Sequence, residues 1–109
     1  MVDNSDSLPT ILVVDDTPDN LILMTDLLKP AYVVKVATNG ERALKLAAGA
    51  AKPDLIMLDI MMPGIDGYEV CKRLKADPNT REIPVVFLTA KSDIEDERHG
   101  FEVGAVDYI

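Results

Sequence analysis

Carboxylates stand directly after two wholly apolar runs of this sequence. Asp15 and Asp16 follow the first run, and Asp59 follows the second. The residues at 63–67, Pro-Gly-Ile-Asp-Gly, predict a sharp turn of the chain just beyond Asp59. Taken singly, each acid also suits a simpler role, because acids are common in the first turn of a helix and at the ends of strands. What they can do together depends on whether the fold brings them together.

Short apolar runs alternate with amphipathic segments along the chain, which predicts strands alternating with helices. The predicted strands are 11–14, 32–37, 55–59, 85–88 and 106–109. The predicted helices start near Thr17, Thr38, Asp66 and Ser92, which are residue types that favour the N-cap position. Unbroken apolar strands between such helices indicate a parallel sheet covered on both faces. We therefore predict an α/β fold, a flavodoxin-like doubly wound parallel sheet of strand order 2-1-3-4-5.

This strand order opens a ligand crevice between the ends of the first and third strands, where Asp15, Asp16 and Asp59 would converge. Like charges about 4 Å apart repel by roughly 4 kcal/mol at an effective dielectric constant near 20, so the cluster requires a cation or a shared proton. Oxygen ligands with no His or Cys nearby suit Mg²⁺ or Mn²⁺. We expect Asp16 and Asp59 to be direct ligands and Asp15 to act through a water molecule.

A carboxylate beside a divalent cation can attack phosphorus, because the cation offsets the repulsion between two anions. Asp59 is the candidate nucleophile and would then carry an aspartyl phosphate. Thr89 follows the strand predicted at 85–88 and could donate a hydrogen bond to one oxygen of that phosphoryl group. On its own, Thr89 would be interpreted as a threonine that simply ends a strand.

Five correctly spaced features together resemble the receiver domain of two-component response regulators. They are Asp15-Asp16, Asp59, the segment Met62-Pro63-Gly64-Ile65-Asp66-Gly67, the pair Thr89-Ala90, and Gly104-Ala105-Val106-Asp107-Tyr108. The resemblance runs from about residue 11 to residue 109. It implies that Asp59 accepts a phosphoryl group from a histidine kinase or a histidine phosphotransfer protein. It also implies that Asp16, Asp59 and the Met61 backbone carbonyl hold the metal, and that Thr89 and Tyr108 form a switch pair.

The resemblance further implies a signalling role in the cytoplasm. Such a domain is a phosphoacceptor that assists its own phosphorylation and dephosphorylation rather than an enzyme, and it switches an interaction surface or an output domain. The segments at 16–20 and 71–75 are similar to receivers that precede cyclic-di-GMP enzymes, which implies an output of that type beyond Ile109.

Three other classes of protein compete with this interpretation. A haloacid-dehalogenase-type phosphatase needs a second Asp two residues after its nucleophile, where this chain has Met61. A flavodoxin-like FMN binder needs a phosphate loop after the first strand, where Asp15 and Asp16 would repel phosphate. A receiver-shaped interaction or dimerisation module that works without phosphorylation stays open as the alternative.

His99, the only histidine, lies in a predicted helix away from the crevice and is interpreted as an exposed helix residue.

Composition limits the class of partner. The 109 residues carry a formal net charge of −8, which argues against direct binding to nucleic acid or to an anionic membrane. Apolar residues make up 48% of the chain, enough for a folded core. The single cysteine, Cys71, cannot form an internal disulfide and suits a reducing compartment. No apolar stretch approaches the roughly 20 residues that a membrane span needs.

The two ends of the chain also carry expectations. Residues 1–8 are typical of a flexible polar lead, and residues 9–109 of the receiver domain itself. In the family the fifth strand leads to a lysine and a fifth helix, and Ile109 stands about two residues short of where that lysine would fall. We therefore expect a fold that lacks the final helix, leaves part of one sheet face bare and tends to self-associate.

Overall fold

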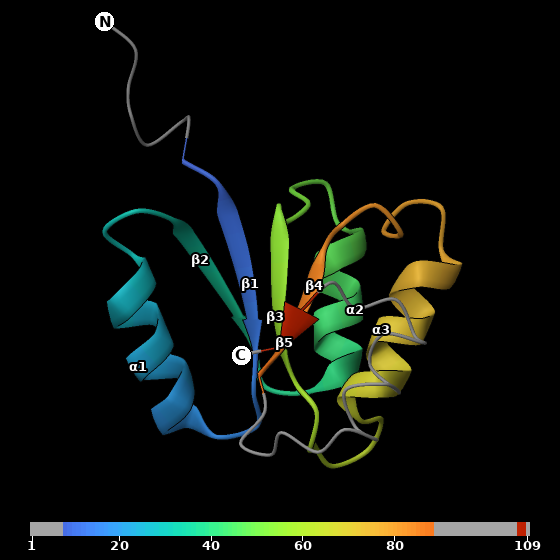
Figure 1. Ribbon diagram of the computed structural model, residues 1–109, viewed down its shortest axis with the longest axis horizontal. Helices are drawn as coiled ribbons and strands as arrows, with labels where there is room; N and C mark the ends of the chain where they lie inside the picture. The colour runs from blue at the N-terminus through green and yellow to red at the C-terminus, as the bar shows by residue number, and fades with distance from the viewer. Residues whose placement is uncertain (1–7, 89–106, 109) are drawn as a thin grey trace, which may run out of the picture.

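The computed structural model describes residues 8–88 and 107–108, in which five parallel strands form one sheet of order β2-β1-β3-β4-β5 (Figure 1). The strands are β1 (Thr10–Val14), β2 (Val33–Ala37), β3 (Leu55–Asp59), β4 (Val85–Leu88) and β5 (Asp107–Tyr108). The helices between the first four strands are α1 (Pro18–Leu28), α2 (Gly40–Ala48) and α3 (Gly67–Ala76). The predicted fold class and strand order are confirmed.

Parts of the predicted organisation lie outside the described residues. They are the polar lead apart from residue 8, Thr89, the helix that starts near Ser92 and contains His99, and Ile109. In the part of the chain that is described, no helix has the length and apolar character needed to cross a membrane.

The central strands are buried on both faces because their side chains alternate between two cores. Ile11 and Val13 of β1 pack with Leu21 of α1 on one face. Leu12 and Val14 belong to a larger core on the other face, which includes buried side chains of α2 and α3. Figure 1 shows this arrangement, with α1 on one side of the sheet and α2 and α3 on the other. The prediction of a sheet covered on both faces is therefore confirmed for the central strands.

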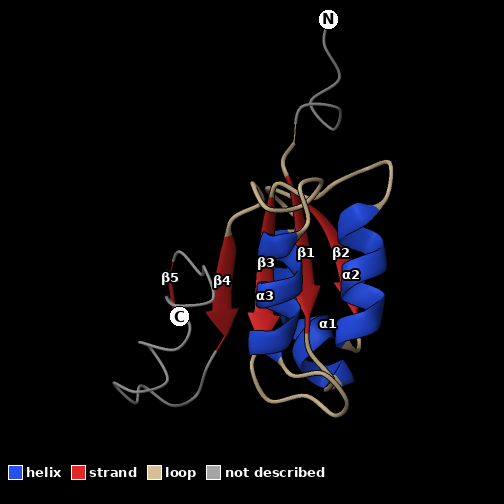
Figure 2. Cartoon of the chain, turned by 90° about the vertical axis from the view of Figure 1, so that its right-hand side faces the viewer, coloured by secondary structure: helices blue, strands red, loops and turns tan. Residues whose placement is uncertain are grey.

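The register brings the strand ends to one edge of the sheet. Val14 of β1 pairs with Ala37 of β2 and with Leu58 of β3. Asp59, the last residue of β3, pairs with Leu88, the last residue of β4. In Figure 2 the arrows of β1, β3 and β4 all point toward this edge. Residues that directly follow these strands therefore gather at the carboxyl-terminal edge.

The helix starts show which predicted caps form. Asp66 caps α3 as predicted, since its carboxylate accepts a hydrogen bond of 2.9 Å from the backbone N–H three residues on. The predicted cap Thr38 is one residue early, because Asn39 caps α2 by accepting a 2.8 Å bond from a backbone N–H. Thr17 occupies the N-cap position of α1, but within the described part of the chain its side chain makes no cap bond. These differences shift the helix starts without altering the topology.

Candidate functional site

Three carboxylates meet at the carboxyl-terminal edge of the sheet. Asp15 and Asp16 follow β1, and Asp59 ends β3, which pairs with β1. One carboxylate oxygen of each residue lies within 4.8 Å of the corresponding oxygens of the other two. Asp15 is buried at 7% exposure, Asp16 is exposed and Asp59 is intermediate. The structure thus brings together the acids that the strand order predicted to converge.

Asp15 is held in place by hydrogen bonds from the start of α1. Its Oδ1 accepts a bond of 2.9 Å from the Thr17 backbone N–H, and its Oδ2 accepts a bond of 3.2 Å from the Asn20 side-chain amide. A buried carboxylate needs such donors, because an unpaired one would lose its hydration without compensation. Sequence reasoning missed Asn20. Its only signal was an amide side chain in the first turn of a helix that starts just after the acids.

The environment of Asp59 opposes its negative charge. Burial raises the pKa of its carboxyl most, the neighbouring charge of Asp15 raises it further, and a hydrogen bond from the Met61 backbone N–H lowers it. Asp16 raises the pKa as well, through its charge and a side-chain hydrogen bond. The net effect moves the pKa of Asp59 from an ordinary value of 3.8 to about 6. A bound cation would remove much of this penalty, because it favours the ionised form.

The donor set fits a small divalent cation. Among the described residues, the cluster consists of carboxylates alone, with neither His nor Cys in it. Mg²⁺ binds oxygen ligands, takes one or two carboxylates and keeps several waters. The partial exposure of Asp59 and the exposure of Asp16 leave such waters access. The site therefore offers ligands that suit a hard cation, beside a carboxylate of raised pKa.

A tight turn carries the chain from β3 into α3. Gly64 adopts φ of 78°, a left-handed conformation that glycine reaches at little cost, so the predicted turn beyond Asp59 is confirmed. The Gly67 backbone N–H then donates a 2.8 Å hydrogen bond to the Ile60 carbonyl oxygen. The first turn of α3 consequently packs against the end of the strand that carries Asp59.

The other predicted site residues are Met61, Tyr108 and Thr89, and the structure describes them to different extents. The Met61 backbone N–H donates a 3.3 Å hydrogen bond to Asp59 Oδ1, and the Met61 side chain is 76% exposed. Tyr108 belongs to β5, where it is in register with Phe87, and its side chain is outside the described set. Thr89 lies outside the described residues. Their proposed roles at the site remain predictions.

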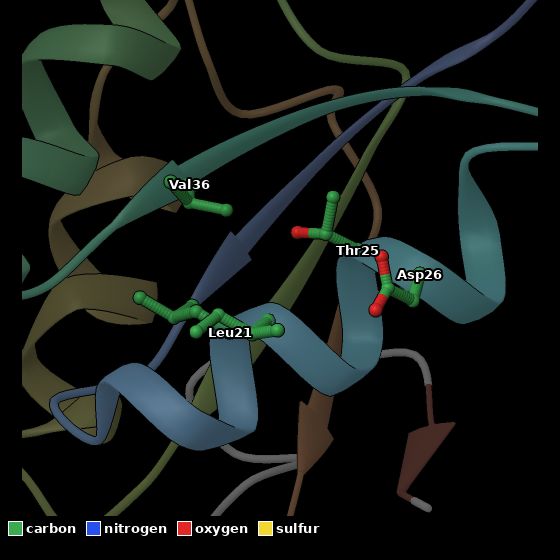
Figure 3. Close-up of a pocket in the computed structure, with 5 residues that line it drawn as sticks. Leu21, Thr25, Asp26 and Val36 are labelled. Atoms are coloured by element: carbon green, nitrogen blue, oxygen red, sulfur yellow. The ribbon is translucent and has the colours of Figure 1, made fainter.

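Two large apolar side chains form an exposed apolar surface on α1. Ile22 and Leu23, in the first half of the helix, are 60% and 58% exposed. Ile22 also lines a hollow of about 290 Å³ with Leu21, Thr25, Asp26 and Val36, between α1 and β2 (Figure 3). No pattern in the sequence indicated this surface.

Comparisons with known proteins agree with this geometry. A family model described as "Response regulator receiver domain" matches residues 11–109. A probable cyclic di-GMP phosphodiesterase of Vibrio cholerae serotype O1 is 51% identical over 100 residues, which cover 92% of this chain and 22% of that protein. Response regulator PleD of Caulobacter vibrioides is 48% identical over 100 residues, which cover 91% of this chain and 22% of PleD.

Solved structures give the same result. The N-terminal domain of a response regulator receiver protein from Methanoculleus marisnigri JR1 superposes with a TM-score of 0.84 at 44% identity, covering 94% of this chain and 83% of that one. The chain spans about a fifth of the length of the two curated relatives, since the matches cover 22% of each. The strand order, the three converging acids and these matches together show that the chain belongs to the family of response regulator receiver domains.

Proposed function

We propose that this receiver domain accepts a phosphoryl group on Asp59 from a histidine kinase or a histidine phosphotransfer protein, with Mg²⁺ or Mn²⁺ as cofactor. The observation that carries the proposal is the acidic cluster, in which oxygens of Asp15, Asp16 and Asp59 lie within 4.8 Å of one another. Such a cluster costs electrostatic energy in the absence of a cation, so stability does not account for it. The domain acts as a signalling phosphoacceptor that assists its own phosphorylation and dephosphorylation, rather than as an enzyme on other substrates.

Residues around the crevice divide the work of holding the cation. Asp16, Asp59 and the backbone carbonyl of Met61 are its protein ligands, and Asp15 acts through a water molecule. This division agrees with the hydrogen bonds that Thr17 and Asn20 already donate to the two Asp15 oxygens. When bound, the cation supplies positive charge that offsets the repulsion between Asp59 and the incoming phosphoryl oxygens.

Asp59 supplies the nucleophile for the transfer. An oxygen of its ionised carboxylate forms a bond to phosphorus while the bond between phosphorus and the donor histidine nitrogen breaks, and that nitrogen keeps the electron pair. The products are an aspartyl phosphate and a free histidine on the donor. The Met61 N–H, 3.3 Å from Asp59 Oδ1, orients the carboxylate for this step.

Thr89 and Tyr108 carry the change from the site to a surface. Leu88, the residue before Thr89, is in register with Asp59, and Phe87 is in register with Tyr108. A Thr89 hydroxyl that bonds the phosphoryl group moves toward the site, and the Tyr108 ring takes the space it leaves. The phosphoryl group biases this switch only because it gains contacts in one of the two states.

The phosphodonor protein docks on the apolar surface of α1. Ile22 and Leu23 are exposed on α1, the helix that begins two residues after Asp16 of the acidic cluster. A helix of the donor that carries its phosphohistidine beside apolar residues is the occupant that this surface fits, because burial of exposed Ile and Leu favours association. The hollow that Ile22 shares with Val36 offers a recess for one of the donor's side chains (Figure 3).

Output and location follow from the relatives and the composition. The two curated relatives are named as a cyclic di-GMP phosphodiesterase and as response regulator PleD, and this chain matches 22% of each. We propose that the switched surface controls an output domain of the cyclic-di-GMP type. The formal net charge of −8 speaks against direct contact with nucleic acid or an anionic membrane. The buried thiol of Cys71 suits the cytoplasm.

The dependence of phosphorylation on the cation tests the proposal. The protein is incubated with a small phosphodonor in Mg²⁺ or in chelator, and the phosphorylated fraction is measured by intact mass. We expect a mass increase of one phosphoryl group in Mg²⁺ alone. Asp26→Asn, which removes an exposed aspartate of α1 that does not belong to the cluster, is the matched control and should behave as the wild type. A lack of any adduct under both conditions would favour an interaction module that works without phosphorylation.

A further inference from the structure

Gly67 leaves no room for a side chain where α3 meets the strand of Asp59. A Cβ atom built on Gly67 would lie 2.7 Å from the Ile60 Cα and 3.0 Å from the Asp59 carbonyl carbon, and closer still to the Asp59 carbonyl oxygen. All three neighbours are backbone atoms, which cannot rotate aside as the end of a flexible side chain can. Any other residue at this position would force the helix start and the Asp59–Ile60 backbone apart.

The requirement at Gly67 is one of space rather than of backbone conformation. Among the described glycines, a positive φ occurs at Gly64 and at no other. Gly67 is instead the first residue of α3, a position where many residues are tolerated on conformational grounds. Its N–H donates a 2.8 Å hydrogen bond to the Ile60 carbonyl oxygen, so the close approach is also a bonded one.

This contact bears on the groups proposed to hold the cation. β3 is held from both sides by β1 and β4, so its central residues cannot shift easily. The segment free to yield is the exit of the strand, where the Asp59 carboxylate and the Met61 N–H are joined by a 3.3 Å hydrogen bond. Functional groups need to be held within about 0.5 Å of their working positions, and Mg²⁺ demands nearly ideal octahedral geometry.

We propose that Gly67 is a positioning residue of the metal and phosphoacceptor site. By letting α3 rest on the Asp59–Ile60 backbone, it sets the place of the Asp59 carboxylate and of Met61 relative to Asp15 and Asp16. This inference depends on the proposed function, because it assigns Gly67 to the site that binds the cation. It goes further than the proposed function, because it makes the affinity for the cation depend on how closely the start of α3 approaches the Asp59–Ile60 backbone.

Gly40 provides a matched control within the same chain. A Cβ atom there would lie 2.5 Å from Val70 Cγ2 and 2.6 Å from Ile65 Cγ1, so it is as crowded as Gly67. Its neighbours are side-chain atoms of Val70 in α3 and of Ile65 in the turn before α3, and not the backbone of Asp59. Gly49, where a Cβ would meet nothing closer than 3.5 Å, serves as an uncrowded control.

The experiment compares Gly67→Ala, Gly40→Ala and Gly49→Ala in the whole chain. Thermal unfolding in chelator gives the stability of each variant, and calorimetric titration with Mg²⁺ gives the dissociation constant at a temperature where all are folded. We expect Gly67→Ala to weaken Mg²⁺ binding at least fivefold. Gly40→Ala should lose stability yet bind Mg²⁺ within twofold of the wild type, and Gly49→Ala should change neither quantity.

The outcomes separate the inference from the proposed function. A wild type that does not bind Mg²⁺ would overturn the proposed function. A wild type that binds while Gly67→Ala binds within twofold of it, or while Gly40→Ala loses as much affinity as Gly67→Ala, would overturn the role of Gly67 alone.

A second measurement on the wild type holds even if Gly67→Ala does not fold. Amide hydrogen exchange is followed with and without Mg²⁺. We expect Mg²⁺ to slow exchange of the Gly67 N–H at least threefold more than that of the Ala43 N–H, which bonds the Asn39 carbonyl at the start of α2. Equal slowing at the two amides would contradict the proposal.

Discussion

The charge of Asp59 governs what the crevice can bind. Burial and the charge of Asp15 raise the pKa of this carboxyl from an ordinary 3.8 to about 6. The folded, metal-free chain therefore holds the proton more tightly than the unfolded chain does. The stability that this group contributes is present at low pH and is lost as the pH rises from about 4 to about 6.

Metal binding should show the opposite pH dependence, because Mg²⁺ competes with the proton for Asp59. Between pH 5 and pH 7.5 the carboxyl passes from mostly protonated to mostly ionised, so we expect Mg²⁺ to bind about tenfold more tightly at the higher pH. Calorimetric titration at the two pH values measures this, with Asp59→Asn as the variant that should bind weakly at both. Equal affinities at pH 5 and pH 7.5 in the wild type would contradict the assignment of the raised pKa.

Asp16 should favour metal binding at the expense of metal-free stability. Asp16→Asn removes one of the three converging charges, so we expect weaker Mg²⁺ binding together with a melting temperature in chelator at least equal to that of the wild type. Thermal unfolding with and without Mg²⁺ checks both parts. If Mg²⁺ stabilises the wild type and Asp16→Asn equally, Asp16 is not a ligand.

At the scale of single residues, the sequence predicted the three acidic residues of the site. It did not predict the neighbouring residues that hold them in place. Asp15, Asp16 and Asp59 were predictable because each follows an apolar strand, and parallel strands end at one edge. The hydrogen bond from Asn20 depends on the angle at which α1 leaves β1, which no local pattern records. The short distance between Gly67 and the Asp59 backbone depends on how α3 packs on the sheet. The sequence did not indicate this contact, because Gly67 was already explained as a turn residue.

At the scale of secondary-structure elements, the positions of the helix starts were predicted more accurately than the side-chain hydrogen bonds that cap them. Thr38, Asn39 and Asp66 are all good capping residues, and the sequence offers no rule for choosing between adjacent candidates such as Thr38 and Asn39. The side chain of Glu69, in the first turn of α3, forms an ion pair with Arg73 at 2.8 Å. The turn after Asp59 was predictable, because Pro63 and Gly64 restrict the backbone there.

The caps differ in what their removal should cost. Asp66→Ala removes a 2.9 Å bond to the first turn of α3, and we expect it to lower the free energy of unfolding by about 1 kcal/mol. Thr17→Ala should change it much less, since within the described chain Thr17 makes no side-chain cap bond. Urea denaturation of the two variants beside the wild type provides the comparison. Equal losses for both would show that side-chain capping does not explain the stability of these helix starts.

For the molecule as a whole, the topology was predictable because unbroken apolar runs separated by amphipathic helices allow few arrangements. The exposure of side chains on the edge strand of the sheet was less predictable. Three valines in β2 indicated a strand but not its burial, and Val33 and Val36 are exposed because β2 is an edge strand of the sheet. The apolar surface of α1 was also missed, since its residues look like core residues until the helix is seated.

That surface leads to a prediction about the donor. We expect Ile22→Ser and Leu23→Ser each to slow phosphotransfer from a phosphorylated histidine phosphotransfer protein by about tenfold, because burial of these apolar side chains against the donor would favour association. Phosphorylation by a small donor should be unchanged, since neither residue belongs to the acidic cluster. The control is Val33→Thr. Val33 is the first residue of β2 and so lies toward the amino-terminal ends of the strands, opposite the end that carries the acidic cluster. Equal slowing with both kinds of donor would mean that the substitutions disturb the site and not the docking.

The location of the phosphoryl group on Asp59 can be measured directly. The protein is incubated with a small phosphodonor and Mg²⁺, digested, and mapped by mass spectrometry before and after hydroxylamine, which cleaves acyl phosphates. We predict one hydroxylamine-labile phosphoryl group on the peptide that contains Asp59, and none in Asp59→Asn. A labile group on another residue, or one that persists in Asp59→Asn, would contradict the account.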